Sequence, residues 1–149
     1  MNNNIRRGVK YEEVITMIYQ YRNNVKVFEY GCIPHPNIEY FAASPDGICE
    51  YNENNPNYTG RMLEIKCPKS RPITGFVPNY YELQIQGQLE VCDLEYCDFL
   101  ECELREYESK DQFFSDTNKS NSLLRENGNE KGIIIEVYNT ELKKTIYFY

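Results

Sequence analysis

Asp46, Glu64 and Lys66 are of the types, and at the spacing, that metal-assisted hydrolysis of a phosphodiester bond requires. In a β-strand, residues i and i+2 share a face, so Glu64 and Lys66 point to one side while Ile65 points to the other. Two carboxylates can hold Mg²⁺ or Mn²⁺, and a nearby ammonium can orient the attacking water. The alternative is a cross-strand ion pair beside a turn aspartate, because Glu-x-Lys alone is a common tripeptide. The three residues together favour the hydrolytic interpretation.

Two predicted strands position these side chains. Met62 to Cys67 form a short apolar strand that Pro68 stops. Tyr40 to Tyr51 form another, with the turn sequence Ser44-Pro45-Asp46-Gly47 inside it. If the two strands are antiparallel neighbours, the carboxylate of Asp46 meets that of Glu64, and the turn frees backbone for a ligand.

The rest of the pattern predicts an α/β fold of the α+β kind. Periodicity indicates a helix over Val9–Arg22, a strand over Val25–Ile33, a helix over Tyr80–Val91 and a strand over Tyr96–Glu106. A three-stranded meander, a crossover helix and one more strand give a mixed central sheet flanked by helices. A polar excursion over about 109–131, expected to be mobile, and an added C-terminal β-hairpin over 132–149 complete a single predicted domain, 1–149.

Composition favours a single globular domain over a membrane protein or a disordered chain. The chain has 149 residues, 41% of them hydrophobic and 14% aromatic, which is typical of one globular domain. No apolar run approaches the roughly 20 residues that span a bilayer, and the first residues do not resemble a signal peptide, so we expect a soluble, intracellular protein with no membrane partner. The net charge of −7 disfavours a simple DNA-binding module more than it disfavours a metal-dependent nuclease.

The cysteines and the one histidine are not expected to take part in the chemistry. The chain has six cysteines without a Cys-x-x-Cys pair, and we predict reduced, mostly buried thiols, with a redox or metal role as the alternative. His35 lies in a turn, where a structural role is the more common one.

Several motifs resemble one known family. They are Ala43-Ser44-Pro45-Asp46-Gly47, Leu63-Glu64-Ile65-Lys66-Cys67-Pro68 and Tyr81-x-x-Gln84-x-Gln86. The chain is similar, from about Gly8 to about Leu104, to the YqaJ-type viral recombinase nucleases. These belong to the phage-lambda-exonuclease-like branch of the PD-(D/E)xK superfamily. The resemblance implies a restriction-endonuclease-like core and a viral or phage-type role in DNA recombination.

The resemblance also implies a role for each matching residue of the catalytic centre. Asp46 and Glu64, with the carbonyl of Ile65, would bind Mg²⁺ or Mn²⁺, and Lys66 would position the water. Gly8-x-x-x-Glu12 matches the family's first-helix motif, so Glu12 would lie near a second metal, with Glu13 as the candidate if the register is off by one. The alternative for Glu12 is an exposed carboxylate favoured at a helix start.

A second set of residues is expected to surround that centre. Gln84 matches the family's helix glutamine at the active-site edge. Gln86 and Gln88 are weaker candidates, although Gln88 shares a helix face with Gln84. Four residues are predicted to contact DNA: Ser44, Lys69, Arg71 and Tyr81. Tyr81 packing in the core, and a solvated loop for the two cations, remain open alternatives.

The resemblance further implies an exonuclease that digests duplex DNA from an end, often as a homo-oligomeric ring, with a single-strand annealing protein as a possible partner. A structure-directed endonuclease and a catalytically silent interaction module remain the alternatives. Seven residues precede Gly8, with Arg6 and Arg7 as their only cations, so a family-type pocket for a 5′ end is in doubt.

Overall fold

The computed structural model describes residues 3–149, with side chains described from residue 6 onward. The chain forms two compact units, the first ending at Glu103 and the second beginning at Leu104. The expectation of one domain over 1–149 stays a prediction.

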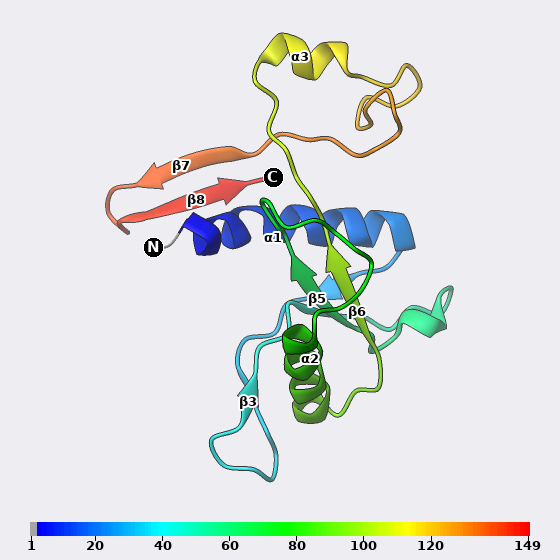
Figure 1. The fold of residues 1–149 in the computed structure, drawn as a ribbon, viewed down its shortest axis with the longest axis vertical. Helices are drawn as coiled ribbons and strands as arrows, with labels where there is room; N and C mark the ends of the chain where they lie inside the picture. Colours follow the sequence, from blue (N-terminus) through cyan, green and yellow to red (C-terminus); the bar gives the residue numbers. More distant parts are fainter. Residues whose placement is uncertain (1–2) are drawn as a thin grey trace. The chain divides into compact units, whose positions relative to one another are not determined.

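A four-stranded mixed sheet forms the centre of the first unit (Figure 1). Its strands, in spatial order, are β1 (Val27–Phe28), β4 (Gly47–Cys49), β5 (Met62–Lys66) and β6 (Cys97–Glu101). β1, β4 and β5 are antiparallel neighbours, whereas β6 pairs in parallel with β5. This confirms the predicted mixed sheet, in which a meander is followed by a crossover helix and one further strand.

Two helices accompany the sheet. α1 (Asn3–Asn23) packs against β5 and buries Tyr11, Ile15 and Tyr19, which recur every four residues and so share one face. It ends at Asn23 and is followed by Asn24, whose positive φ of 52° is a left-handed conformation that asparagine tolerates. α2 (Asn79–Cys92) packs beside the small sheet of β2 (Ile33–Pro34) and β3 (Ala42–Ala43), as Figure 1 shows.

Two of the predicted strands were drawn too long. The strand predicted over 25–33 is divided into β1 and β2, and the strand predicted over 40–51 into β3 and β4. The reason is an exchange of partners, because β2 pairs with β3 whereas β1 pairs with β4. The Ser44–Asp46 turn separates the two pairings. The strand predicted over 96–106 is limited to β6, and α1 begins six residues before the predicted start.

Gly47 allows a close approach between β1 and β4. A Cβ atom at this position would lie 2.2 Å from Cγ1 of Val27 and 3.4 Å from the carbonyl oxygen of Phe28. The distance to Val27 is too short for a side chain, so glycine at this position lets the strand that follows Asp46 enter the sheet. The core next to it contains Met62, Leu63 and Ile15, which are fully buried.

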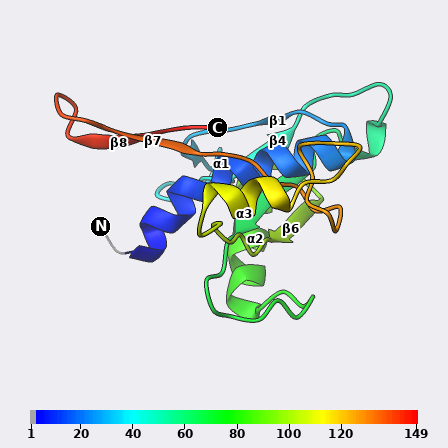
Figure 2. The same cartoon turned by 90° about the horizontal axis from the view of Figure 1, so that it is seen from above.

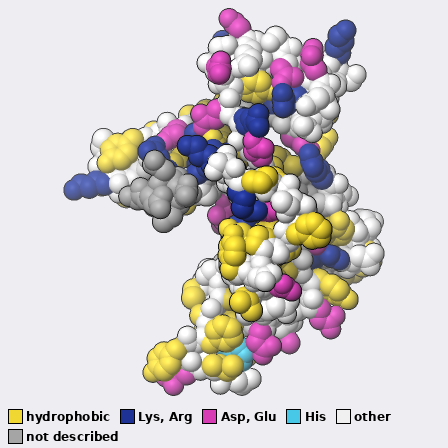
Figure 3. All heavy atoms as spheres, viewed as in Figure 1, with side chains coloured by type: hydrophobic (Ala, Val, Ile, Leu, Met, Phe, Trp, Pro, Cys, Tyr) yellow, Lys and Arg dark blue, Asp and Glu magenta, His cyan; other side chains and the backbone are white. Residues whose placement is uncertain are grey.

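Charged side chains of both signs are scattered among hydrophobic and uncharged groups in Figure 3. This agrees with a net charge of −7 on 16 basic and 23 acidic residues. No helix within residues 3–149 has the length and apolar character needed to cross a membrane.

The second unit contains α3 (Lys110–Ser115) and a hairpin of β7 (Ile135–Asn139) and β8 (Lys144–Phe148). The hairpin confirms the prediction for residues 132–149, and Figure 2 shows it as an extended two-stranded ribbon. A two-stranded ribbon is marginally stable alone in water.

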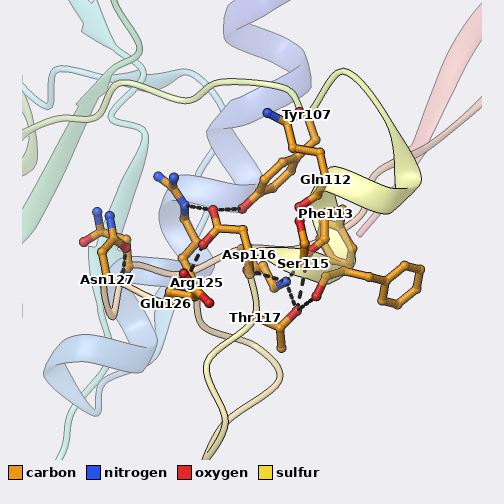
Figure 4. Close-up of polar contacts among 12 residues, drawn as sticks. Tyr107, Gln112, Phe113, Ser115, Asp116, Thr117, Arg125, Glu126 and Asn127 are labelled. Atoms are coloured by element: carbon orange, nitrogen blue, oxygen red, sulfur yellow. Dashed lines mark hydrogen bonds and ion pairs between the residues drawn. The ribbon is translucent and has the colours of Figure 1, made fainter.

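A hydrogen-bonded network lies within the polar excursion over 109–131, whose mobility stays a prediction. Asp116 accepts hydrogen bonds from the Tyr107 hydroxyl, from Nε of Arg125 and from the backbone N–H of Glu126, at 2.9, 2.7 and 3.0 Å (Figure 4). These donors, Arg125 foremost, lower the pKa of Asp116 to about 2. Nζ of Lys131 donates to the carbonyl oxygen of Asp116 at 2.7 Å. The segment is therefore organised around one carboxylate in place of an apolar core.

Candidate active site

The register of β4 and β5 brings Asp46 and Glu64 together. Gly47 pairs with Leu63, so continuing the antiparallel register by one residue sets Asp46 opposite Glu64. Oδ2 of Asp46 accepts a hydrogen bond of 2.6 Å from the backbone N–H of Ile65. The side chain of Asp46 therefore takes the place of a backbone carbonyl as the acceptor for the Ile65 N–H of β5. This hydrogen bond holds the Asp46 carboxylate next to that of Glu64.

Glu64 is the most enclosed charged side chain of the site, with 1% of its surface exposed. Its Oε1 accepts hydrogen bonds from Nζ of Lys66 and from Nε2 of Gln84, the latter at 2.8 Å. Its Oε2 accepts a hydrogen bond of 3.0 Å from Nε2 of Gln88. A buried carboxylate is tolerated only when such donors compensate for its lost hydration.

Repulsion among carboxylates marks the site electrostatically. Burial, followed by repulsion from Glu64, raises the pKa of Asp46 to about 6, against the lowering effect of the Ile65 N–H and of Lys66. Burial, followed by repulsion from Asp46 and Glu29, raises the pKa of Glu12 to about 7. Burial and mutual repulsion thus disfavour the charged forms of these carboxyls in the absence of a cation, and a divalent cation would offset both effects.

The two α1 glutamates differ in the charged groups that act on their pKa. The pKa of Glu12 responds to Asp46, Glu64 and Lys66, so its carboxylate lies within their field. The pKa of Glu13 is raised first by burial and then by Glu29 alone. The register that puts Glu12 near the carboxylate pair is therefore the one that the fold adopts.

An aromatic ring supports the lysine of the site. Nζ of Lys66 lies 4.9 Å from the ring centroid of Tyr81, and that ring in turn lies 5.4 Å from the ring of Phe99 on β6. A cation over a ring face gains electrostatic stabilisation. Lys66 is therefore held between the ring on one side and the Glu64 carboxylate on the other.

The donor set fits a hard divalent cation that keeps several water ligands. Within residues 3–149 no three His, Cys, Asp or Glu side chains converge closely enough to hold a metal ion by themselves. Two carboxylates, a backbone carbonyl such as that of Ile65 and water are, however, the ligands that Mg²⁺ prefers. Burial and the neighbouring carboxylates raise the pKa of Asp46 and of Glu12, so a bound cation would stabilise their charged forms.

The predicted DNA-contacting residues differ in how they are placed. Ser44 and Lys69 are exposed. Arg71 forms an ion pair with Glu101, and its guanidinium carbon lies 6.0 Å from the Tyr81 ring centroid. Tyr81 packs against Phe99, and its contact with DNA stays a prediction.

The sequence analysis ranks Gln86 and Gln88 together as weaker candidates than Gln84 for a place at the site. The structure separates the two residues. The structure buries Gln88 against Glu64 and leaves Gln86 exposed on another face of α2. The available signal was the spacing of four residues from Gln84, which sets both glutamines on one helix face.

His35 has a structural role in its turn, and the cysteines form no disulfide among the described residues. Nδ1 of His35 accepts the backbone N–H groups of Asn37 and Ile38 at 3.0 and 2.9 Å, and its ring stacks on Phe41. The six cysteines are free thiols. Only Cys49 among them is buried and Cys32 is exposed, so the expectation of mostly buried thiols was too strong.

Comparison with known proteins agrees with this arrangement. The sequence pattern of the YqaJ-like viral recombinase domain matches residues 1–95. A protein of Acanthamoeba polyphaga mimivirus is 41% identical over 152 residues, which cover 95% of this chain and 28% of that protein. The chain thus spans just over a quarter of its viral relative.

Two crystal structures of the alkaline exonuclease LHK-Exo from Laribacter hongkongensis, one of them in complex with dAMP, have a similar fold. Each superposes with a TM-score of 0.60 at 29% sequence identity, covering 75% of this chain and 55% of that enzyme. The fold is therefore restriction-endonuclease-like, as the sequence predicts. With the family pattern matching 95 of 149 residues, the chain belongs to the YqaJ-like viral recombinase domain family.

Proposed function

We propose that this domain is a Mg²⁺- or Mn²⁺-dependent deoxyribonuclease that degrades duplex DNA from an end. The observation that carries the proposal is the meeting of Asp46, Glu64 and Lys66 at the C-terminal end of β5, with Glu12 close enough for its pKa to respond to them. Membership of a recombinase family and likeness to an alkaline exonuclease support hydrolysis of DNA as the reaction.

Asp46 and Glu64 would hold the cation, with the carbonyl of Ile65 as a further ligand and Glu12 near a second ion. The bound ion would offset charge on the phosphate and activate a water. Lys66 orients that water and stabilises its deprotonated form, while Tyr81 keeps the ammonium in place. Gln84, whose amide already donates to Glu64, lines the edge that the substrate approaches.

The surface charge favours attack at an end over attack within a duplex. Internal duplex binding depends on neutralising many phosphates, whereas this chain carries a net charge of −7 and mixed charges on the face in Figure 3. An end requires only a few donors. Ser44 and Lys69 are exposed and are proposed to contact the backbone, with a contribution from Arg71 if its pairing with Glu101 is exchanged.

Assembly would complete the mechanism. A homo-oligomeric ring around the product strand supplies processivity without a basic monomer, and a single-strand annealing protein would receive the exposed strand. Both partners are proposals that rest on the family.

The test compares linear duplex DNA with covalently closed circular duplex, each with Mg²⁺ and with EDTA. We expect degradation of the linear form to nucleotides, survival of the circle and no cleavage in EDTA. Nicking of the circle at a similar rate would make the domain an endonuclease. Failure to cut either DNA by the well-folded chain would favour a silent interaction module.

A further inference from the structure

Gln88 joins the two segments that carry the proposed metal ligands. It lies on α2 with only 5% of its surface exposed. Its Nε2 donates to Oε2 of Glu64 at 3.0 Å and to the carbonyl oxygen of Ser44 at 3.3 Å. Only the N–H side of an amide can face a carboxylate and a carbonyl together, so the orientation of this side chain follows from its partners.

The amide oxygen of Gln88 lowers the stability of the fold. Oε1 of Gln88 is buried and has no hydrogen-bond partner among the described residues. An unsatisfied buried acceptor destabilises the fold, and an apolar side chain of similar length would avoid that cost. Packing alone therefore does not explain a glutamine at this position.

Gln84 and Gln88 donate to different carboxylate oxygens of Glu64. Oε1 of Glu64 already accepts two donors, from Lys66 and Gln84, whereas Oε2 accepts only one, from Gln88. Because each carboxylate oxygen has two acceptor positions, Oε2 keeps one for a cation. Gln84 is exposed and can exchange its contact with solvent or substrate, whereas the buried Gln88 cannot do so easily.

We propose that Gln88 is a positioning residue that turns Oε2 of Glu64 toward the cation and fixes the Ser44–Asp46 turn opposite it. It acts through Glu64 and Asp46 and does not itself bind the ion. The proposal rests on the proposed function, because it presumes that these carboxylates bind a divalent metal. Its consequence is that Gln88 controls metal affinity in the absence of DNA.

The experiment measures Mn²⁺ binding to the whole chain at pH 8 without DNA, from the electron paramagnetic resonance signal of free Mn²⁺. Gln88→Met keeps the unbranched shape and removes both N–H contacts, and Gln88→Leu tests the same loss with a different shape. Gln86→Met on the exposed face of α2 is the matched control. Thermal melts without metal report the fold of each variant.

We expect the Mn²⁺ Kd to weaken about 10- to 100-fold in both Gln88 variants, the usual effect of losing a residue that orients a ligand. The Gln86→Met variant should bind like the wild type. Unchanged Mn²⁺ affinity in the folded Gln88 variants would overturn the inference while leaving the nuclease proposal intact. Loss of folding in both Gln88 variants would also overturn it, by assigning the residue a structural role. If the wild type itself binds no Mn²⁺, the metal-dependent function fails first.

Discussion

Replacing Glu12 with glutamine should stabilise the metal-free protein at high pH. The folded protein raises the pKa of this carboxyl from 4.5 to about 7, mainly through burial and through repulsion by Asp46. A group whose folded pKa is raised destabilises the fold when ionised. The penalty is absent below pH 4.5, grows as the pH rises, and is complete above pH 7.

The size of the effect follows from the same pKa. For a fully buried carboxyl the change would correspond to about 3 kcal/mol at pH 8. Glu12 is only half-buried, so solvent screening reduces our expectation to about 1 kcal/mol. For a chain of this length, that corresponds to a rise in Tm of about 3 °C.

The assay is thermal unfolding of wild type and Glu12→Gln in EDTA at pH 8 and at pH 5, with Glu95→Gln, an exposed loop variant, as the control. We expect a gain in Tm for Glu12→Gln at pH 8 that shrinks at pH 5, and no such gain for the control. Excess Mg²⁺ should reverse the order at pH 8, because the ion stabilises the wild-type carboxylates more. A loss of Tm at pH 8, or an equal gain at both pH values, would refute the electrostatic argument.

Four further changes test the remaining parts of the site. Asp46→Asn should abolish cleavage and keep the fold, since an amide oxygen can still accept from the Ile65 N–H; appreciable residual activity would remove Asp46 from the metal site. Glu64→Gln should also abolish cleavage but lower Tm, because three N–H donors would then face a neutral amide, and an unchanged Tm would contradict that donor count. Lys66→Ala should slow single-turnover cleavage by a factor on the order of 10² or more. The change also removes a donor from the buried Glu64 and so lowers Tm in either case, but an unchanged rate would reduce Lys66 to an ion pair. Gly47→Ala should cost about 1–3 kcal/mol, measured by denaturant unfolding, because the added Cβ meets Val27 at 2.2 Å; an unchanged midpoint would show that β1 yields freely.

The segment that carries Glu64 and Lys66 was predictable because its signals are local. β5 is an apolar run that proline stops, and the i, i+2 rule fixes which of its residues share a face. α2 shows helical periodicity and ends at Asp93 in a left-handed conformation, close to the predicted end. One assumption, that the strands of Asp46 and Glu64 are antiparallel neighbours, then gave the carboxylate pair.

The features that escaped prediction depend on contacts between distant segments. The exchange of partners at Ser44–Asp46 is decided by which strand lies alongside, and a strand pattern of one segment does not contain that information. The same holds for Arg71, whose pairing with Glu101 requires β6 to lie beside β5 in parallel. Cations next to a catalytic strand are therefore weak predictors of DNA contact until their acidic neighbours are known.

The second unit shows the same limit for composition. Residues 109–131 have the polar composition that is typical of a mobile loop. Composition does not reveal the network, because its contacts converge on the carboxylate of Asp116 and not on an apolar cluster. Asp116 satisfies three donors, and Lys131 donates at 2.5–2.7 Å to two carbonyls and to a threonine hydroxyl. Such a polar network favours a single conformation only when each polar group in it has a hydrogen-bond partner. The conformation of residues 109–131 therefore depends on a few side chains. The aligned region shared with the mimivirus protein covers 95% of this chain and so extends past residue 95, into the segment that contains this network.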